Sequence, residues 1–253
     1  MDELIIRKPI DVPTRATVSF ITSHLPSGAA VLEVGCGEGH VAQELVNRGY
    51  QLIGVDSDQE VIARAQGRGF RVIQASWPEF GSAPLDGVVF TRSLHHIGPL
   101  QKAIRKAREV LRPRGTLLVE DFAFDEADQL TISWFLEVLR SQAAKALITP
   151  VPREFVTDLL GSKHPAAVWH QSHDHQLHTI AAMTQAIAEY FIIQETQQVP
   201  YLYRYLVPVL PETLEAAAFV EGVVREEAHL GGRGAEVLVG RRIVGSRREG
   251  DTS

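Results

Sequence analysis

The sequence predicts an α/β protein with a doubly wound, mostly parallel sheet and a helical cap inserted after the fifth strand. In the first half of the chain, short apolar segments alternate with amphipathic helical segments through brief turns. This alternation is typical of parallel strands that are covered by helices on both faces, and right-handed crossovers make such a sheet doubly wound. After residue 123 the alternation gives way to longer helical segments.

Composition sets the class of protein before any motif is considered. The chain has 253 residues, which is enough for one large domain, and its net charge of -6 argues against a dominant nucleic-acid surface. No apolar run reaches the roughly 20 residues that cross a bilayer, and the N-terminal residues do not resemble a signal peptide. The single cysteine, Cys36, excludes an internal disulfide. We therefore expect one domain over residues 1–253, located in the cytoplasm, without membrane or nucleic-acid partners.

The first half predicts five strands and the helices between them. The first predicted helix carries apolar residues at helical spacing, namely Val18, Ile21 and Leu25. Gly49 follows the next helical segment and is a typical helix terminator. The predicted strands cover residues 30–34, 51–56, 71–75, 86–91 and 116–121, and the predicted helices cover residues 14–25, 41–48, 59–66 and 99–111.

The second half predicts the inserted cap and the end of the sheet. We expect a cap over residues 124–180 and a disordered tail over residues 245–253. One long helix over 125–147, a second over 151–160 and an irregular, histidine-rich segment over 163–178 make up most of the cap. The remaining predicted elements are a helix over 177–189, a strand over 191–196, a helix over 211–229 and a final strand over 236–244.

The segment VLEVGCGEGH, residues 31–40, predicts a ligand site at the end of the first strand. Gly35, Gly37 and Gly39 allow a tight turn and the close approach of a ligand, and the helix that follows directs backbone N–H groups at the same place. Open α/β sheets bind ligands at this edge. The alternative is a tight strand-to-helix turn that binds nothing.

Two acids strengthen the prediction of a site. Glu33 lies within an otherwise apolar strand, where it either contacts polar ligand groups or pins the loop. Asp56 ends the second strand, near the spacing at which a carboxylate meets a ribose diol, although a helix cap is the other common role for such an aspartate. A dinucleotide fingerprint requires its third glycine where this chain has His40. The pattern therefore favours an adenosine ligand without phosphates.

These motifs resemble those of class I S-adenosylmethionine-dependent methyltransferases, and most closely the small-molecule group that includes ubiquinone and menaquinone biosynthesis enzymes. VLEVGCGEGH with Asp56 is similar to the family's first motif and acidic ribose site. LDGVVFTRSLHHI, residues 85–97, and LRPRGTLLVEDFA, residues 111–123, match later motifs in the expected order. The resemblance implies a seven-stranded, Rossmann-like methyltransferase fold, and S-adenosylmethionine as the cofactor.

The resemblance also implies which residues contact the cofactor. Where the family often has an acid after its third strand, this chain has Ala75, Ser76 and Trp77, so the contact with adenine is expected to differ. The expected cofactor-binding residues are Glu33, Gly35, Cys36, Gly37, Gly39, Asp56, Ser57, Ser76, Trp77, Thr91, Arg92 and Ser93.

Histidines are the candidates for contact with the methyl acceptor. His96, with its neighbour His95, follows the fourth strand, where these histidines either face the methyl group or pack and hydrogen-bond to the loop. His173 and His175 belong to a cluster with His170, His178 and Asp174. We select His96, His173 and His175 as candidate catalytic residues. The cluster can also be a solvated loop or a metal site, but its spacing matches no metal motif, so we expect no metal. Tyr201, Tyr203 and Tyr205 either line an acceptor pocket or pack a helix.

The predicted function is therefore methyl transfer from S-adenosylmethionine to a small-molecule acceptor by in-line displacement. Neither the acceptor, nor the type of atom methylated, nor the oligomeric state follows from these residues. The alternatives are a noncatalytic module that binds S-adenosylmethionine and, less favoured by the glycine spacing, an NAD-dependent oxidoreductase.

Overall fold

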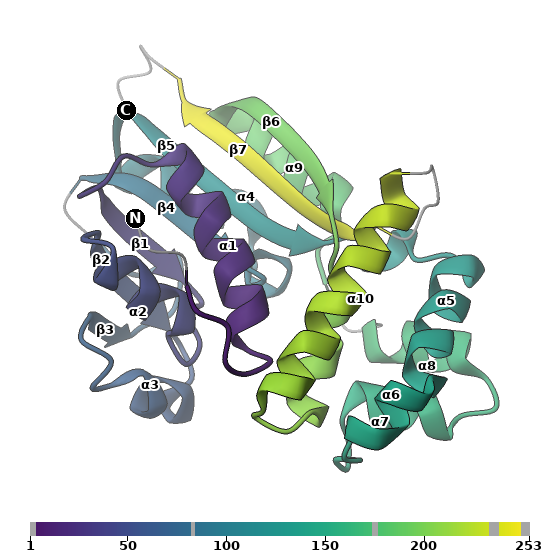
Figure 1. Ribbon diagram of the computed structural model, residues 1–253. Helices are drawn as coiled ribbons and strands as arrows, with labels where there is room; N and C mark the ends of the chain where they lie inside the picture. The colour runs from purple at the N-terminus through teal and green to yellow at the C-terminus, as the bar shows by residue number, and fades with distance from the viewer. Residues whose placement is uncertain (1–3, 82–83, 174–176, 233–237, 249–253) are drawn as a thin grey trace.

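A seven-stranded sheet forms the centre of the computed structural model, which describes residues 4–81, 84–173, 177–232 and 238–248. The strand order is β3-β2-β1-β4-β5-β7-β6 (Figure 1). The strands are β1 (Ala30–Val34), β2 (Gln51–Asp56), β3 (Arg71–Gln74), β4 (Leu85–Thr91), β5 (Leu111–Phe122), β6 (Phe191–Val199) and β7 (Gly240–Arg247).

All strand pairs are parallel except the two that involve β7, which lies antiparallel between β5 and β6. The predicted doubly wound, mostly parallel sheet is therefore confirmed. Chain order along the sheet reverses between β1 and β4, so the crevice beyond the carboxyl ends of these strands is the expected ligand position. Thr91 of β4 lies beside Glu120 of β5, and Glu120 lies beside Arg242 of β7.

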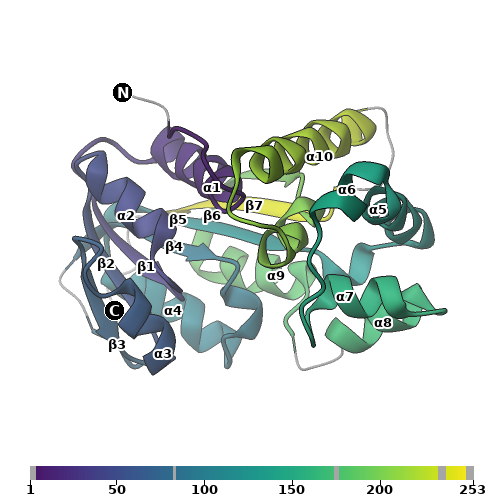
Figure 2. The same cartoon turned by 60° about the horizontal axis from the view of Figure 1, so that its bottom comes forward.

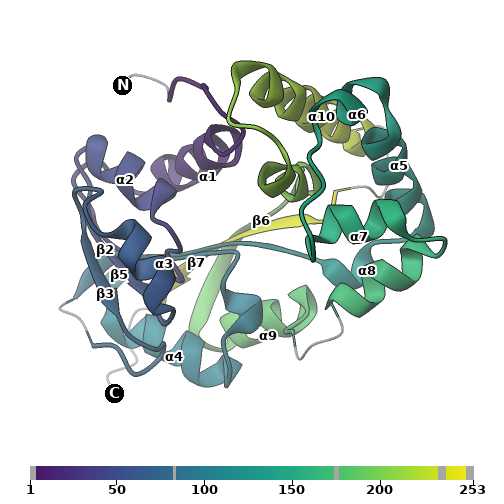
Figure 3. The same cartoon turned by 90° about the horizontal axis from the view of Figure 1, so that it is seen from below.

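Helices cover both faces of the sheet (Figure 3). On one face lie α1 (Asp11–His24), α2 (His40–Asn47) and α10 (Leu214–Gly232), and on the other lie α4 (Leu100–Val110) and α9 (Ile180–Tyr190). Each face buries a separate apolar cluster, with Ile21 and Leu45 in the first and Ile104 and Ile187 in the second. The remaining helix of the first half is α3 (Gln59–Ala65). Burial of apolar side chains on both faces is what drives parallel strands together.

A third apolar cluster lies beside the sheet, on the right of Figure 2. It contains side chains of α5 (Gln129–Arg140), α7 (Phe155–Gly161), α8 (Pro165–His173), the 3₁₀ segment η3 (Leu202–Val209) and α10. The short elements η1 (Leu94–His96), η2 (Phe124–Glu126) and α6 (Gln142–Leu147) complete the chain. Helices from the predicted cap therefore pack with η3 and α10, which the sequence did not assign to it.

Three predicted boundaries are wrong. The helix predicted over 125–147 is interrupted at Ser141, whose extended backbone ends α5 and whose hydroxyl caps α6 by accepting from Ala144 N–H. Part of the segment predicted to be irregular forms α8. The last strand begins at Gly240 and continues to Arg247, so residues 245–247 belong to the sheet and not to a tail. Residues 249–253 lie outside the described part of the chain.

Candidate functional site

The glycine loop between β1 and α2 is held against β2. The N–H groups of Gly35 and Cys36 both donate to the carbonyl of Val55, at 2.7 and 3.1 Å. Gly35 and Gly37 have φ values of +72° and +55°, which side chains rarely adopt. A Cβ on Gly35 would lie 2.4 Å from the Cβ of Ser93, whereas a Cβ on Gly37 would point into open space. The loop is thus closed on one side and open at Gly37.

Asp56 joins the end of β2 to this loop. Its carboxylate accepts from the N–H of Gly37 and the N–H of Asp58, both at 3.0 Å. Asp58 caps α3, since it accepts from the N–H groups of Glu60 and Val61. Asp56 is therefore not the helix cap, and both of its oxygens retain lone pairs for a further donor.

Two cavities open around the glycine loop, and Gly35 and Arg92 line both of them. The first measures about 580 Å³, and the second measures about 410 Å³. Every residue predicted to bind the cofactor lines one of them. Those on the first are Gly35, Asp56, Ser57, Ser76, Trp77, Arg92 and Ser93. Those on the second are Glu33, Gly35, Cys36, Gly37, Gly39, Thr91 and Arg92.

Trp77 borders the first cavity from the core side. Its indole N–H donates to the carbonyl of Ala103 at 3.1 Å, and its ring meets Phe90 edge to face. These contacts fix the ring, which remains 7% exposed. Ser76 precedes it at the same wall of the cavity.

Glu33 borders the second cavity with an unpaired oxygen. The Thr91 hydroxyl donates to Oε1 at 2.7 Å, while the buried Oε2 has no hydrogen-bond partner. Burial raises the pKa of Glu33 to about 7, and the Thr91 hydrogen bond and the charge of Arg92 oppose that rise only in part. An orphan carboxylate oxygen of this kind is suited to a ligand that brings a hydrogen-bond donor.

Arg92 lines both cavities. It directly follows β4 and has a φ of +60°, an unusual value for a residue with a side chain. Its N–H donates to the carbonyl of Glu120 at 2.7 Å, and the hydroxyl of the next residue, Ser93, donates to the carbonyl of Val34 at 2.6 Å. These bonds hold an unfavourable backbone conformation at the carboxyl edge of the sheet, as is common at functional sites.

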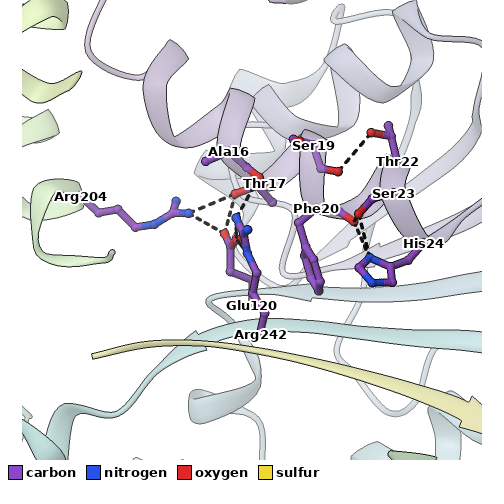
Figure 4. Close-up of polar contacts among 10 residues, drawn as sticks. All are labelled: Ala16, Thr17, Ser19, Phe20, Thr22, Ser23, His24, Glu120, Arg204 and Arg242. Atoms are coloured by element: carbon purple, nitrogen blue, oxygen red, sulfur yellow. Dashed lines mark hydrogen bonds and ion pairs between the residues drawn. The ribbon is translucent and has the colours of Figure 1, made fainter. Parts of the chain in front are cut away.

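A buried charge cluster around Glu120 adjoins the second cavity, and the sequence did not predict it (Figure 4). Glu120 accepts from the hydroxyl of Thr17 at 2.5 Å, from Arg204 Nη2 at 2.5 Å and from Arg242 Nε at 2.7 Å. Burial alone would raise the pKa of this carboxyl, but Arg204 and Arg242 outweigh burial and hold it below its usual value. Thr17 and Arg204 line the second cavity. The signal for Arg204 was a lone charge within the apolar run YLYRYL.

The paired histidines after β4 have different surroundings. His95 is buried, and its Nδ1 lies 2.6 Å from Oδ1 of Asp121. His96 is exposed and lines the first cavity. Their adjacent positions in the chain do not reveal this difference, because it depends on which ring turns toward β5.

His173 lies in an aromatic cluster and does not line either of these two cavities. Its Nδ1 lies 2.7 Å from the carbonyl of Trp169, and its Nε2 lies 3.0 Å from the hydroxyl of Tyr205. Its ring also contacts Phe122 and Phe155. The predicted neighbours His175 and Asp174 lie outside the described residues.

The rest of the predicted histidine cluster is dispersed. His170 is exposed on α8, whereas Nε2 of His178 lies 3.1 Å from the carbonyl of Ile97. Among the residues that the structure describes, no three His, Cys, Asp or Glu side chains are grouped to hold a metal ion. Tyr201 and Tyr203 are buried, and Tyr201 stacks on Phe122 of β5, so Tyr201 packs against the sheet.

None of the described helices is both long and apolar enough to span a bilayer.

Comparison with known proteins gives a consistent picture. A family model described as "Methyltransferase domain" matches residues 7–160. An uncharacterized methyltransferase of Oceanobacillus iheyensis is 32% identical over 133 residues, which are 49% of this chain and 61% of that protein. A trans-aconitate 2-methyltransferase of Sinorhizobium fredii is 28% identical over 194 residues, which cover 70% of this chain and 71% of the relative. The match with the first of these relatives thus spans less than two thirds of its length.

Two solved structures have a similar fold. An S-adenosylmethionine-dependent methyltransferase from Mesorhizobium loti has a TM-score of 0.54 at 14% identity, with coverage of 92% of this chain and 97% of that chain. Magnesium protoporphyrin IX methyltransferase from Synechocystis, solved with bound SAM, has a TM-score of 0.51 at 13% identity, with coverage of 95% and 82%.

Proposed function

This chain belongs to the methyltransferase domain family, and from that premise we propose that it transfers a methyl group from S-adenosylmethionine to a small-molecule acceptor. The observation that carries the proposal is the pair of cavities that share Gly35 and Arg92 on the carboxyl edge of the sheet. Two neighbouring spaces that share wall residues on this edge suit an adenosine and its amino-acid end. The acceptor of the trans-aconitate relative is itself a small molecule, which supports the same class here.

The residues present fit this cofactor in two respects. The open space at Gly37 leaves room for a ligand against the loop backbone, and the orphan Oε2 of Glu33 offers an acceptor to an ammonium group. We place the adenosine in the first cavity, with Asp56 accepting from the ribose hydroxyls and with Ser57, Ser76 and Trp77 around the base. The cofactor, when bound, supplies a methyl group on a cationic sulfur.

We place the amino-acid end of the cofactor in the second cavity. Its wall supplies Glu33, Cys36, Gly39 and Thr91. Gly35 and Arg92 line both cavities, and Ser93 lines the first. These groups bind and orient the donor, and in a displacement reaction such orientation accounts for much of the rate.

The acceptor is proposed to approach from the side of His96. We infer a single domain in which the described part of the cap predicted over residues 124–180, packed with η3 and α10, covers that side and excludes water. His96 contacts the acceptor, and His173 acts as a positioning residue through Tyr205.

The single cysteine supports a cytoplasmic location. A noncatalytic binding module remains the second candidate, and His40 at the position of a third dinucleotide glycine disfavours NAD.

The first prediction concerns binding of the cofactor product. S-adenosylhomocysteine should bind wild-type protein in calorimetry, whereas NAD should produce no heat. Asp56→Ala should weaken that binding by about 1–3 kcal/mol, because it removes a charged acceptor and the hydrogen bond to Gly37. Asp58→Ala is the matched control, since it removes the cap of α3 and should change the affinity by less than a factor of about three. Binding of NAD in preference to S-adenosylhomocysteine would refute the proposal.

The second prediction separates the two histidines. With acceptors identified from the release of S-adenosylhomocysteine, His96→Ala should slow turnover by about 10-fold and leave the Kd of S-adenosylhomocysteine unchanged. His173→Phe keeps an aromatic ring but removes the hydrogen bond to Tyr205, so it should raise the KM for the acceptor more than it lowers kcat. Full activity of both variants with the best acceptor would exclude roles for these side chains.

A further inference from the structure

The cluster around Glu120 holds more positive than negative charge. Two guanidinium groups, from Arg204 and Arg242, share this one carboxylate, and all three groups are largely withdrawn from solvent. One arginine is sufficient to balance a carboxylate, and an additional buried cation is costly unless an anion accompanies it. The other buried carboxyl whose charge acts on Arg204 is Glu227, and burial raises the pKa of Glu227 to about 7, so it is only partly ionised at neutral pH. The cluster therefore keeps some positive charge that is not needed to neutralise Glu120.

Arg204 is the charged member of the cluster that lines the second cavity, whereas Arg242 is not part of its wall. Arg204 uses Nη2 to bind Glu120 and Thr17, and its buried Nε has no hydrogen-bond partner. Arg92 stands on the wall of the same cavity. Two guanidinium groups from distant parts of the chain are thus brought to one space.

The carboxylates at this cavity do not offset these cations. Glu38 pairs with Arg64 at 2.8 Å, and Glu212 pairs with Lys8 at 3.3 Å. Glu33 is held partly protonated near neutral pH by its burial. The space beside Arg92 and Arg204 is therefore positively charged.

We propose that Arg204, together with Arg92, forms a carboxylate-binding site in the second cavity. The planar, forked guanidinium suits a carboxylate, and the positive charge beyond what Glu120 neutralises suits an anionic group. Arg204 lies beyond the segment matched by the family model, so the shared motifs do not supply it. The site deepens the proposed function, and the carboxylate comes either from the amino-acid end of the donor or from the acceptor.

Two ligands that differ by this group test the donor as the source. S-adenosylhomocysteine carries the amino-acid end, and 5′-methylthioadenosine lacks it. If the donor's carboxylate is bound, Arg204→Gln and Arg92→Gln should each lower the affinity for S-adenosylhomocysteine by roughly 10-fold or more in calorimetry. The affinity for methylthioadenosine should change by less than about twofold. Arg204→Lys keeps the charge without the fork and is expected to recover part of the affinity.

A second titration tests the acceptor as the source. Protein saturated with S-adenosylhomocysteine is titrated with succinate, with citrate and with the uncharged succinamide. If the acceptor's carboxylate is bound, at least one of the two acids binds and succinamide does not, and Arg204→Gln abolishes this binding while the affinity for S-adenosylhomocysteine is retained.

Two control variants test whether the effect requires an arginine that lines the cavity. Arg242→Gln removes the same charge from the same carboxylate but away from the cavity, so it is expected to lower the Tm and leave both titrations intact. Arg105→Gln, on the exposed side of α4, is expected to change nothing. Arg204→Gln leaves Glu120 paired one-to-one with Arg242, and Arg92 is exposed, so at least the Arg92 variant is expected to fold.

The proposal is overturned if Arg204→Gln and Arg92→Gln, folded by circular dichroism, bind S-adenosylhomocysteine like wild type and no acid binds the loaded protein in an Arg204-dependent way. Should wild-type protein fail to bind S-adenosylhomocysteine at all, the proposed function fails instead. Binding of the two acids to that unloaded protein would still support the carboxylate site.

Discussion

Gly37→Val is expected to abolish binding of S-adenosylhomocysteine, with an affinity at least about 100-fold weaker in calorimetry. The new side chain would occupy the open space that Gly37 leaves at the wall of the second cavity. Gly37 also has a φ of +55°, which a β-branched residue adopts only with strain of about 1–2 kcal/mol. A shift of the loop to relieve this strain would weaken the hydrogen bond from Gly37 N–H to Asp56.

Gly28→Val controls for backbone strain in this experiment. Gly28 also has a positive φ, +81°, and open space at its Cβ, but it precedes β1 and does not line either of the two cavities. Both variants should lose a similar amount of stability, and only Gly37→Val should lose the ligand. Equal affinities in the two variants would show that the glycine loop is only a turn.

Glu33→Gln is expected to stabilise the ligand-free protein by about 3 kcal/mol at pH 8. The pKa of Glu33 rises from 4.5 to about 7 on folding because the carboxyl is buried, and each pKa unit corresponds to about 1.4 kcal/mol. A raised carboxyl pKa means that the folded state binds more protons between these two values. Stability therefore falls as the pH rises from 4.5 to about 7, and the full cost is present above that range.

Urea unfolding between pH 4 and pH 8 measures this effect. The stability gained by Glu33→Gln should be near zero at pH 4 and should grow to its full value by pH 8. Glu227→Gln is the matched control, because burial raises the pKa of Glu227 to about 7 as well and one of its oxygens is also unpaired. Both variants should be more stable than wild type, but only Glu33→Gln should lower the affinity for S-adenosylhomocysteine. A gain that does not depend on pH would contradict the assignment.

The sequence predicts the first half of the fold well, and it predicts residues that the structure brings to one edge of the sheet, because both depend on local patterns. A buried parallel strand is visible in the sequence as a short apolar run, and the glycine loop is defined by the backbone conformation of consecutive residues. Asp56 is distant from the glycine loop in the sequence, but its position can still be predicted. Because β1 and β2 pair in parallel, the end of β2 lies beside the loop that follows β1. The predicted cofactor residues accordingly gather at one edge of the sheet.

The parts that escaped prediction depend on contacts between distant segments. Arg204 meets Glu120 across 84 positions and Thr17 across 187, and no pattern near Arg204 specifies either partner. The break at Ser141 was missed because a serine within an apolar-periodic segment is compatible with a continuous helix until its cap forms. The limits of β7 are set by its pairing with β5 and β6 rather than by its own alternation.

The position of Glu120 also has a consequence for the order in which the chain folds. Residues 7–160, which match the family, contain Glu120 and Thr17 but neither arginine that neutralises the carboxylate. A nascent chain that has emerged only that far holds a carboxylate that it cannot bury without a penalty of several kcal/mol. Arg204 and Arg242 both follow that segment in the chain, and Arg242 arrives only when β7 enters the sheet between β5 and β6. The wall of the second cavity is therefore completed only after residues 204–212 have been synthesised, well after the glycine loop on the same wall.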